Sequence, residues 1–154
     1  MSRTAPAGLS APARTVRLLA TLVMIAGVLL LAAGVATWVT VQTQLADERI
    51  TVSDDASFLA GDEINGPFSA YAEAQVIEKH ALESSKGKTY AELDREDPTR
   101  QTVMTGSFLR ASLFTSVVSF GVAAMAMGIG VLLALIGYAL FLVSRQLSTL
   151  SSRA

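Results

Sequence analysis

The chain has 154 residues, of which 51% are hydrophobic and 16% charged, and its formal net charge is −1. It contains no cysteine, so disulfides, thiolate metal sites, a cysteine nucleophile and a lipidated N-terminal cysteine are all excluded. The length is that of one domain.

The first predicted elements are two long apolar stretches, residues 18–41 and 111–144, which contain no Asp, Glu, Lys, Arg or His. They are 24 and 34 residues long, and about 20 apolar residues in a helix match a hydrocarbon core of about 30 Å. The alternative is a pair of core helices in a soluble protein. The remaining 96 residues could not surround two such helices. The sequence therefore predicts an all-α membrane protein: two transmembrane helices with a small, mainly helical extracytoplasmic domain between them.

The distribution of charge predicts the orientation. The segments before residue 18 and after residue 144 contain five arginines and no acid, and Arg14, Arg17 and Arg145 lie nearest to the apolar stretches. All 13 acidic residues lie within residues 42–110, whose net charge is −6. Because Arg and Lys beside a span resist translocation, we expect both ends in the cytoplasm and the acidic segment outside. Trp38 would then lie at the outer headgroup level.

A cleaved signal peptide is the alternative for the first stretch. Gly34-Val35-Ala36 supplies small residues of the kind that a signal peptidase recognises. The apolar core of a signal peptide is typically 7–15 residues long, and this stretch is longer, which favours an uncleaved helix. Cleavage would leave one span with its N-terminus outside.

The predicted organisation has five segments in chain order. Residues 1–15 are a disordered basic cytoplasmic tail, 16–41 the first transmembrane helix, 42–110 the acidic extracytoplasmic domain, 111–144 the second transmembrane helix, and 145–154 a cytoplasmic tail. Residues 42–48 are expected to prolong the first helix by a turn or two. The outer domain has few large apolar residues, so we expect it to pack on the helix ends, on a second copy or on another protein.

Turn and capping residues predict the elements of the outer segment. Residues 49–52 favour an extended piece, and Asn65-Gly66-Pro67 is typical of a turn that leads into a helix, here over residues 68–84. Gly87 is placed to end that helix. Thr89 and Glu92 fit a capping box that starts a second short helix.

A third helix is predicted from Asp97-Pro98, which can cap and begin it. Nothing in the sequence must end this helix before residue 143, so its first turns stand above the bilayer, with a bend expected at Gly106.

Small residues recur every seven positions within both spans, which returns them to nearly the same helix face. Such grooves let backbones approach closely, so the two spans are expected to pack on each other, with a homodimer or another membrane partner as the alternative. The predicted packing residues are Ala20, Gly27, Gly34, Ala123, Ala126, Gly130, Ala134 and Gly137.

Chemical motifs are weak throughout. Gly87-Lys88-Thr89 ends like a phosphate-binding loop, but Leu82 stands where the first glycine of that loop belongs, so we expect no nucleotide. The only histidine, His80, cannot form a zinc or iron site by itself. Neither span contains an ionisable group, which disfavours a pump or carrier. We expect no catalytic residue, no cofactor, no metal and no nucleic acid, and therefore no enzyme.

The chain resembles a family of uncharacterised small two-span actinobacterial membrane proteins over about residues 40–143. The similarity lies in the segments 50–55, 66–72, 88–95 and 107–113. The resemblance implies a bacterial plasma membrane and an outer segment of similar length. Members often carry the label aromatic ring-opening dioxygenase, which implies an iron centre with histidine ligands or a subunit beside one. With one histidine, this chain does not supply such a centre alone.

The expected function is that of a non-enzymatic integral membrane protein whose outer domain binds or braces a protein partner at the cell surface. The alternative is an accessory subunit of a membrane enzyme or transport complex, with the chemistry in other subunits. The predicted partner surface is the acidic cluster Glu92, Asp94, Glu96 and Asp97.

Overall fold

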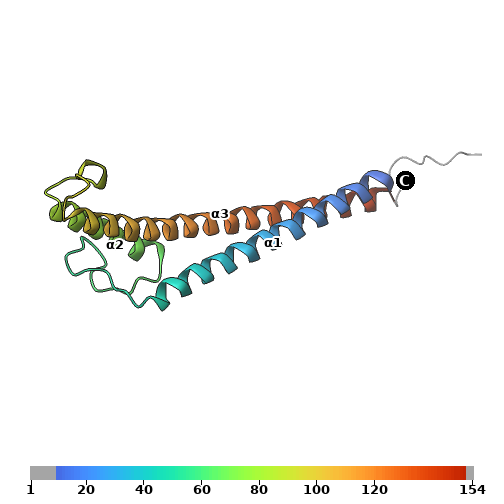
Figure 1. Ribbon diagram of the computed structural model, residues 1–154. Coiled ribbons are helices and arrows are strands. Elements are labelled where there is room, and N and C mark those ends of the chain that lie inside the picture. Colours follow the sequence, from blue (N-terminus) through green and yellow to red (C-terminus); the bar gives the residue numbers. More distant parts are fainter. Residues whose placement is uncertain (1–9, 152–154) are drawn as a thin grey trace, which may run out of the picture. The chain divides into compact units, whose positions relative to one another are not determined.

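A computed structural model describes the backbone of residues 10–151 and the side chains of residues 14–147. It contains three α-helices and one short 3-10 helix (Figure 1): α1 (Ser10–Asp47), α2 (Pro67–Ser84), η1 (Tyr90–Glu92) and α3 (Arg100–Ser151). The described residues form no strand beyond an isolated antiparallel bridge between Thr51 and Glu63. The predicted all-helical fold is confirmed for this part of the chain.

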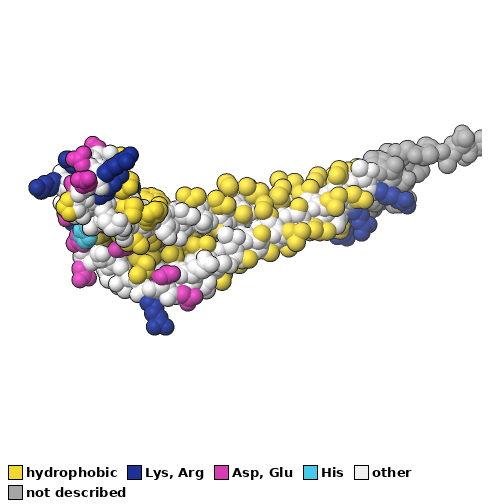
Figure 2. Space-filling model, viewed as in Figure 1, with side chains coloured by type: hydrophobic (Ala, Val, Ile, Leu, Met, Phe, Trp, Pro, Cys, Tyr) yellow, Lys and Arg dark blue, Asp and Glu magenta, His cyan; other side chains and the backbone are white. Residues whose placement is uncertain are grey.

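Helices α1 and α3 are long and apolar enough to cross a membrane. The apolar part of α1 lies within Arg14–Asp47, with a mean hydropathy of 2.6, and that of α3 within Arg100–Leu147, with a mean hydropathy of 2.4. Only 17% and 11% of the most apolar windows are buried within the chain. Figure 2 shows the resulting hydrophobic surface on both helices. A core helix of a soluble protein would be mostly covered by its own chain, and these two are not.

The helices extend further than the sequence predicted. Helix α1 begins at Ser10, so residues 10–15 are helical and not the predicted disordered tail. Helix α3 continues to Ser151, into the predicted tail of residues 145–154, because no Gly or Pro follows Gly137 before that point. An established helix propagates easily, which explains both extensions. Residues 1–9 and 152–154 of the two predicted tails lie outside the described residues.

The chain divides into two compact units, and α1 and α3 each contribute to both. Met1–Val35 and Met125–Ala154 form one, here called the paired-helix unit. Ala36–Ala124 forms the other, here called the core unit. The core unit includes the whole predicted outer segment and also the apolar residues 36–41 and 111–124, which the sequence placed inside the spans.

The core unit has a hydrophobic core that joins the connecting segments to the ends of the two long helices. Val52 and Ile64 are 1% and 0% exposed and bring the α1–α2 connection into the core. Trp38 of α1 and Phe120 of α3 meet edge to face, with ring centroids 4.7 Å apart. The core therefore rests on the helix ends, one of the three supports that the sequence left open. Its other members are Leu45, Ala70, Ala72, Ala74 and Leu113, with Val41, Ala56, Ile77, Phe114 and Val117 packed against them.

Backbone hydrogen bonds fold the α1–α2 connection into a small hairpin-like loop. The Val52 N–H donates to the Asp62 carbonyl at 2.8 Å, and the Ile64 N–H donates to the Ile50 carbonyl at 3.0 Å. This pairing turns Val52 and Ile64 toward the same core. The extended piece predicted for residues 49–52 is thus short and bonded to its own loop.

Helix α2 begins and ends where the turn residues indicated. Pro67 occupies its first turn, and the N-cap residue, Gly66, is extended and donates its N–H to Ser69 Oγ at 3.3 Å. Past its C-terminus, Gly87 has a φ of +83° and donates its N–H to the Leu82 carbonyl at 2.7 Å. Glycine is the residue most often found in this left-handed conformation just after a helix.

Helices α2 and α3 approach closely at Gly106. A Cβ on this glycine would lie 3.2 Å from the Ala81 Cβ and 3.7 Å from Ile77 Cγ2. Glycine at this position therefore permits close contact with α2, a role that differs from the bend predicted there.

Candidate functional site

The small residues of the two long helices face each other within the paired-helix unit. Ala20, Gly27, Gly34, Gly130 and Gly137 are all buried. A Cβ on Gly27 would lie 2.6 Å from both the Ala134 nitrogen and the Gly130 carbonyl oxygen, and one on Gly130 would lie 2.7 Å from the Gly27 carbonyl oxygen. The two backbones are therefore in direct contact, and no other amino acid fits at these positions without displacing the helices.

Helices α1 and α3 run antiparallel in this unit. Gly137 lies against Ala20 and Met24, since a Cβ on it would be 2.9 Å from the Ala20 carbonyl oxygen and 2.8 Å from the Met24 nitrogen. Nearer the chain ends, the Arg17 guanidinium lies 5.6 Å from the centre of the Phe141 ring. The other predicted packing residues differ: Ala123 is buried in the core unit, and Ala126 and Ala134 are half-buried.

Two other glycines on α3, Gly121 and Gly128, have no neighbour among the described residues. A Cβ on Gly121 or Gly128 would meet nothing within 4 Å, and both residues are exposed. They are seven positions apart, as Gly130 and Gly137 are, but they occupy a different face of the helix.

The predicted topology arginines are all exposed. Arg14, Arg17 and Arg145 belong to the paired-helix unit. The contact between Arg17 and Phe141 brings Arg17 near the end of α3 that carries Arg145. Basic side chains gather there, while acidic side chains gather on the core unit (Figure 2).

The four acids of the predicted partner surface do not form a cluster of unbonded carboxylates. The Thr89 N–H and hydroxyl both donate to Glu92 Oε2 at 2.8 Å, so Glu92 closes the predicted capping box. The Thr99 N–H donates to Asp97 Oδ1 at 2.8 Å, and the Thr99 hydroxyl does so at 2.6 Å. These hydrogen bonds lower the pKa of both carboxyl groups. Two of the four acids are thus used in capping, Glu92 at the start of η1 and Asp97 just before α3.

The surroundings of the other two acids are balanced in charge. Asp94 and Glu96 are exposed. The segment 85–100 contains four acids and four bases, so its net charge is zero. One of the bases, Arg100, lies over the Tyr90 ring at 4.0 Å and donates to the Leu93 carbonyl at 2.5 Å. This segment is therefore a poor match to a strongly basic partner.

The acidic excess lies instead on the α1–α2 connection, residues 48–66, which contains five acids and one arginine. Beside it, the structure forms a groove of about 460 Å³ between α1, α2 and α3. Leu45, Ile77, Leu109 and Leu113 supply its apolar lining, and the groove is also bordered by Glu48, Ile50, Thr51, Glu73 and Ser112. Sequence reasoning missed the groove because it combines three segments that are far apart in the chain, residues 45–51, 73–77 and 109–113.

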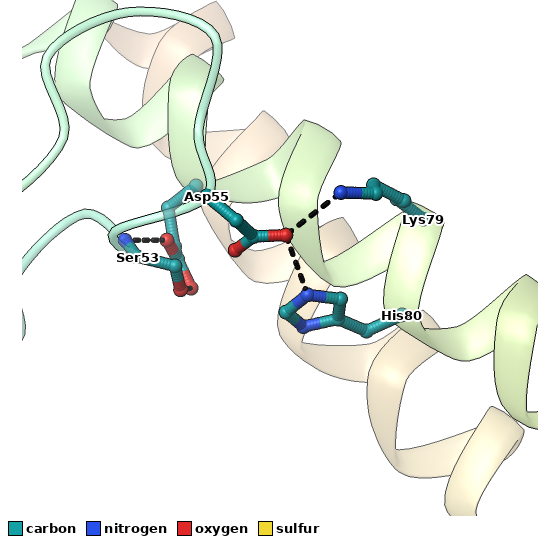
Figure 3. A network of polar contacts seen from close by, with 5 residues as sticks. Ser53, Asp55, Lys79 and His80 are labelled. Atoms are coloured by element: carbon teal, nitrogen blue, oxygen red, sulfur yellow. Dashed lines mark hydrogen bonds and ion pairs between the residues drawn. The ribbon is translucent and has the colours of Figure 1, made fainter.

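A polar network fastens the acidic connection to α2 (Figure 3). The Ser53 N–H donates to Glu73 Oε2 at 2.8 Å, and the Ser53 hydroxyl donates to Glu73 Oε1 at 3.0 Å. Asp55 Oδ2 accepts a hydrogen bond from Lys79 Nζ at 2.8 Å and lies 2.9 Å from His80 Nε2. Hydrogen bonding to Lys79, and then to His80, lowers the Asp55 pKa to about 2.

This network has the character of a clamp, not of a reacting centre. The Lys79, His80 and Asp55 side chains are 52%, 53% and 43% exposed, which leaves them in water. Among the described residues no group of three or more His, Cys, Asp or Glu side chains is placed to hold a metal ion.

Comparisons with protein-family models, with curated proteins and with solved structures found no match to this chain. The resemblance to actinobacterial two-span proteins therefore stays a prediction.

Proposed function

We propose that this chain is an integral protein of a bacterial plasma membrane, that α1 and α3 are its two spans, and that both ends lie in the cytoplasm. The observation that carries the proposal is the bare hydrophobic surface of two long helices, of which under a fifth is buried in the most apolar windows. Lipid is the medium in which such a surface is stable, because both helices satisfy their backbone hydrogen bonds internally.

The orientation follows from the arginines. Arg14, Arg17 and Arg145 are exposed at the ends of the apolar stretches, where cytoplasmic Arg and Lys are enriched in membrane proteins. The acidic segment of residues 42–110 then lies outside the cell.

The core unit is proposed to bind or brace a protein partner at the cell surface. It has its own hydrophobic core, so it can present a fixed surface. Its groove joins an apolar floor to Glu48 and to Glu73, whose carboxylate also holds Ser53. An apolar partner segment that carries a Lys or Arg matches this combination, since charge complementarity guides encounter and apolar burial supplies affinity.

An accessory subunit of a membrane enzyme or transport complex is the second candidate. It is favoured by Gly128 of the paired-helix unit, which is exposed on α3 and would let the helix of another subunit approach closely. In that case the partner contacts lie along α3 and not in the groove.

Labelling of single-cysteine variants in intact cells tests the topology, because the native chain has no cysteine. Glu96→Cys should react with a membrane-impermeant maleimide, and Leu147→Cys should react only after the cells are opened. The opposite pattern would overturn the proposed orientation.

Site-specific photo-crosslinking separates the two candidate functions. A photoreactive residue at Ile50, which borders the groove and is 41% exposed, should capture the partner of a cell-surface protein. The same residue at Met125, which is 59% exposed on α3, should capture the other subunit of a complex. Crosslinks from Met125 alone, to catalytic or transport subunits, would replace the first function by the second.

A further inference from the structure

Four large apolar side chains of the core unit, three of them aromatic, are exposed over more than a third of their surface. Phe68, at the start of α2, is 74% exposed, and Tyr71, one turn later, is 41% exposed. Phe58 and Leu59 of the α1–α2 connection are 41% and 38% exposed. The segments that carry these residues, 56–61 and 64–72, contain no charged residue, and the exposed acids Asp62 and Glu63 lie between them. We call the four side chains the aromatic collar.

The collar is tied to a definite level along α3. The Tyr71 and Phe114 rings meet edge to face at 5.8 Å, and the Phe58 ring lies 6.5 Å from that of Tyr71. Further along, Glu78 pairs with Arg110 at 2.8 Å, and Ala81 faces Gly106.

These contacts show that α2 and α3 are antiparallel. Phe68 therefore lies about 4.5 Å beyond Tyr71, at 1.5 Å per residue, in the direction that leads along α3 from Phe114 toward Phe120. Phe120 itself contacts Trp38 of α1.

Helix length indicates where the hydrocarbon ends. In the paired-helix unit, the uncharged part of α1 covers residues 18–35 and that of α3 covers residues 125–144. At 1.5 Å per residue these are about 27 and 30 Å long, close to the roughly 30 Å of a hydrocarbon core. Residues 36–41 and 111–124 are apolar but exceed that length, and in the core unit several of them are covered by protein.

The outer headgroup region then falls at the level of Trp38 and Phe120, which is the level that Phe68 approaches. Aromatic side chains favour this region of a bilayer.

From these observations we propose that the aromatic collar inserts into the headgroup and upper acyl region of the outer leaflet. The inference rests on the proposed membrane topology and adds a lipid-binding surface to it. The occupant is the bilayer, because the collar is uncharged, aromatic and placed where the hydrocarbon ends; a second copy of the chain or another protein is the alternative.

Tryptophan fluorescence in lipid vesicles tests the proposal, because Trp38 is the only tryptophan. In a Trp38→Phe background, Phe68→Trp should lose most of its fluorescence in phosphatidylcholine brominated near the headgroup, and little in iodide solution. The matched control is Phe108→Trp, since Phe108 is 69% exposed on α3 but lies six residues, or about 9 Å, further from the span than Phe114. It should respond to iodide and not to bromine.

Two outcomes would contradict insertion of the aromatic collar into the bilayer. Quenching of Phe68→Trp by iodide alone would place the residue in water, and quenching by neither agent would place it under a second copy of the protein. Leu29→Trp, near the middle of the α1 span and 65% exposed, tests the topology separately. If lipid brominated near the acyl end quenches the fluorescence of Leu29→Trp, the two spans are supported independently of the result for Phe68→Trp. No quenching there would refute the proposed function itself.

A second measurement leaves Trp38 in place. In vesicles, Phe68→Cys should react with a soluble maleimide more slowly than Phe108→Cys, and the chain offers no other thiol. Equal rates would contradict insertion even if the tryptophan variants fail to fold.

Discussion

The two compact units join the same two helices in different ways. In the paired-helix unit the backbones touch at Gly27 and Gly130, with atoms where a Cβ would have to go. In the core unit the helices are joined through large side chains, with Trp38 against Phe120, and by a loop and a third helix that cover them. The first has close backbone contact and little coverage; the second has side-chain burial, caps and ion pairs.

The packing of the paired-helix unit is typical of helices in lipid, and that of the core unit is typical of protein in water. In lipid, apolar side chains gain nothing from leaving the medium, so helices associate by van der Waals packing of small residues. In water, burial of apolar area supplies the stabilisation, so large side chains are buried and polar ones bond at the surface. The change in packing style along α1, from Gly27 to Trp38, therefore fits the proposed topology.

The largest expected effect comes from Phe120→Ala. Phe120 is 1% exposed, and removal of a buried Phe side chain typically costs about 3–5 kcal/mol. Hydrogen exchange at the Val52 and Ile64 amides, which are bonded within the loop, should accelerate strongly. The control is Phe108→Ala, which removes an exposed ring from the same helix. Equal acceleration in the two variants would show that Phe120 does not support the core unit.

Gly130→Ala should weaken the paired-helix unit by about 1–3 kcal/mol, the usual cost of overpacking, and Gly130→Ile by more. The added Cβ would lie 2.7 Å from the Gly27 carbonyl oxygen and the Leu31 nitrogen. SDS titration of micellar protein, followed by Trp38 fluorescence, measures the change. Gly128→Ala is the matched control, because its Cβ would meet open space. If the control shifts the midpoint as far as Gly130→Ala does, close backbone contact is not what holds the helices.

Glu73→Gln should loosen the attachment of the α1–α2 loop to α2 by about 1 kcal/mol, since a neutral acceptor replaces a charged one. The Ser53 amide donates to this carboxylate, so its hydrogen exchange reports the change. Glu63→Gln alters an exposed carboxylate of the same loop and serves as the control. Unchanged protection of Ser53 in the Glu73 variant would mean that the loop is held by its backbone bonds alone.

The smallest effect concerns the pH dependence of the Asp55 clamp. The folded Asp55 pKa is about 2, below the ordinary value of 3.8, because Lys79 and His80 bond to the charged form. The clamp therefore stabilises the fold above pH 3.8, and this contribution is lost as the pH falls through 2. Lys79→Gln should raise the Asp55 pKa, measured by NMR of its carboxyl carbon, while Lys86→Gln should leave it in place. A low Asp55 pKa that survives Lys79→Gln would rule out this origin.

Local chemistry made much of the fold predictable from the sequence. Pro67, Gly87 and the pair Thr89 and Glu92 mark turns and caps, and each acts on backbone atoms within a few residues. The seven-residue spacing of Gly130 and Gly137 likewise indicates one helix face whatever surrounds it.

What the sequence did not reveal depends on contacts between distant segments. Glu73 bonds to Ser53, 20 residues earlier, and no pattern within α2 indicates this partner. By contrast, the bonds from Thr89 to Glu92 and from Thr99 to Asp97 lie within three residues, and the sequence indicated a capping role for both acids. The groove needs Leu45, Ile77 and Leu113 together. The periodicity of one segment cannot predict which residues of distant segments come into contact.

The contact between Trp38 and Phe120 also has a consequence for biosynthesis. Its two rings are separated by 82 residues of chain, so α1 leaves the ribosome well before its partner in the core unit exists. At about 5–20 residues per second the delay is roughly 4–16 seconds. During that interval Trp38 has no Phe120 ring to pack against, and the core of Val52 and Ile64 lacks its α3 side chains.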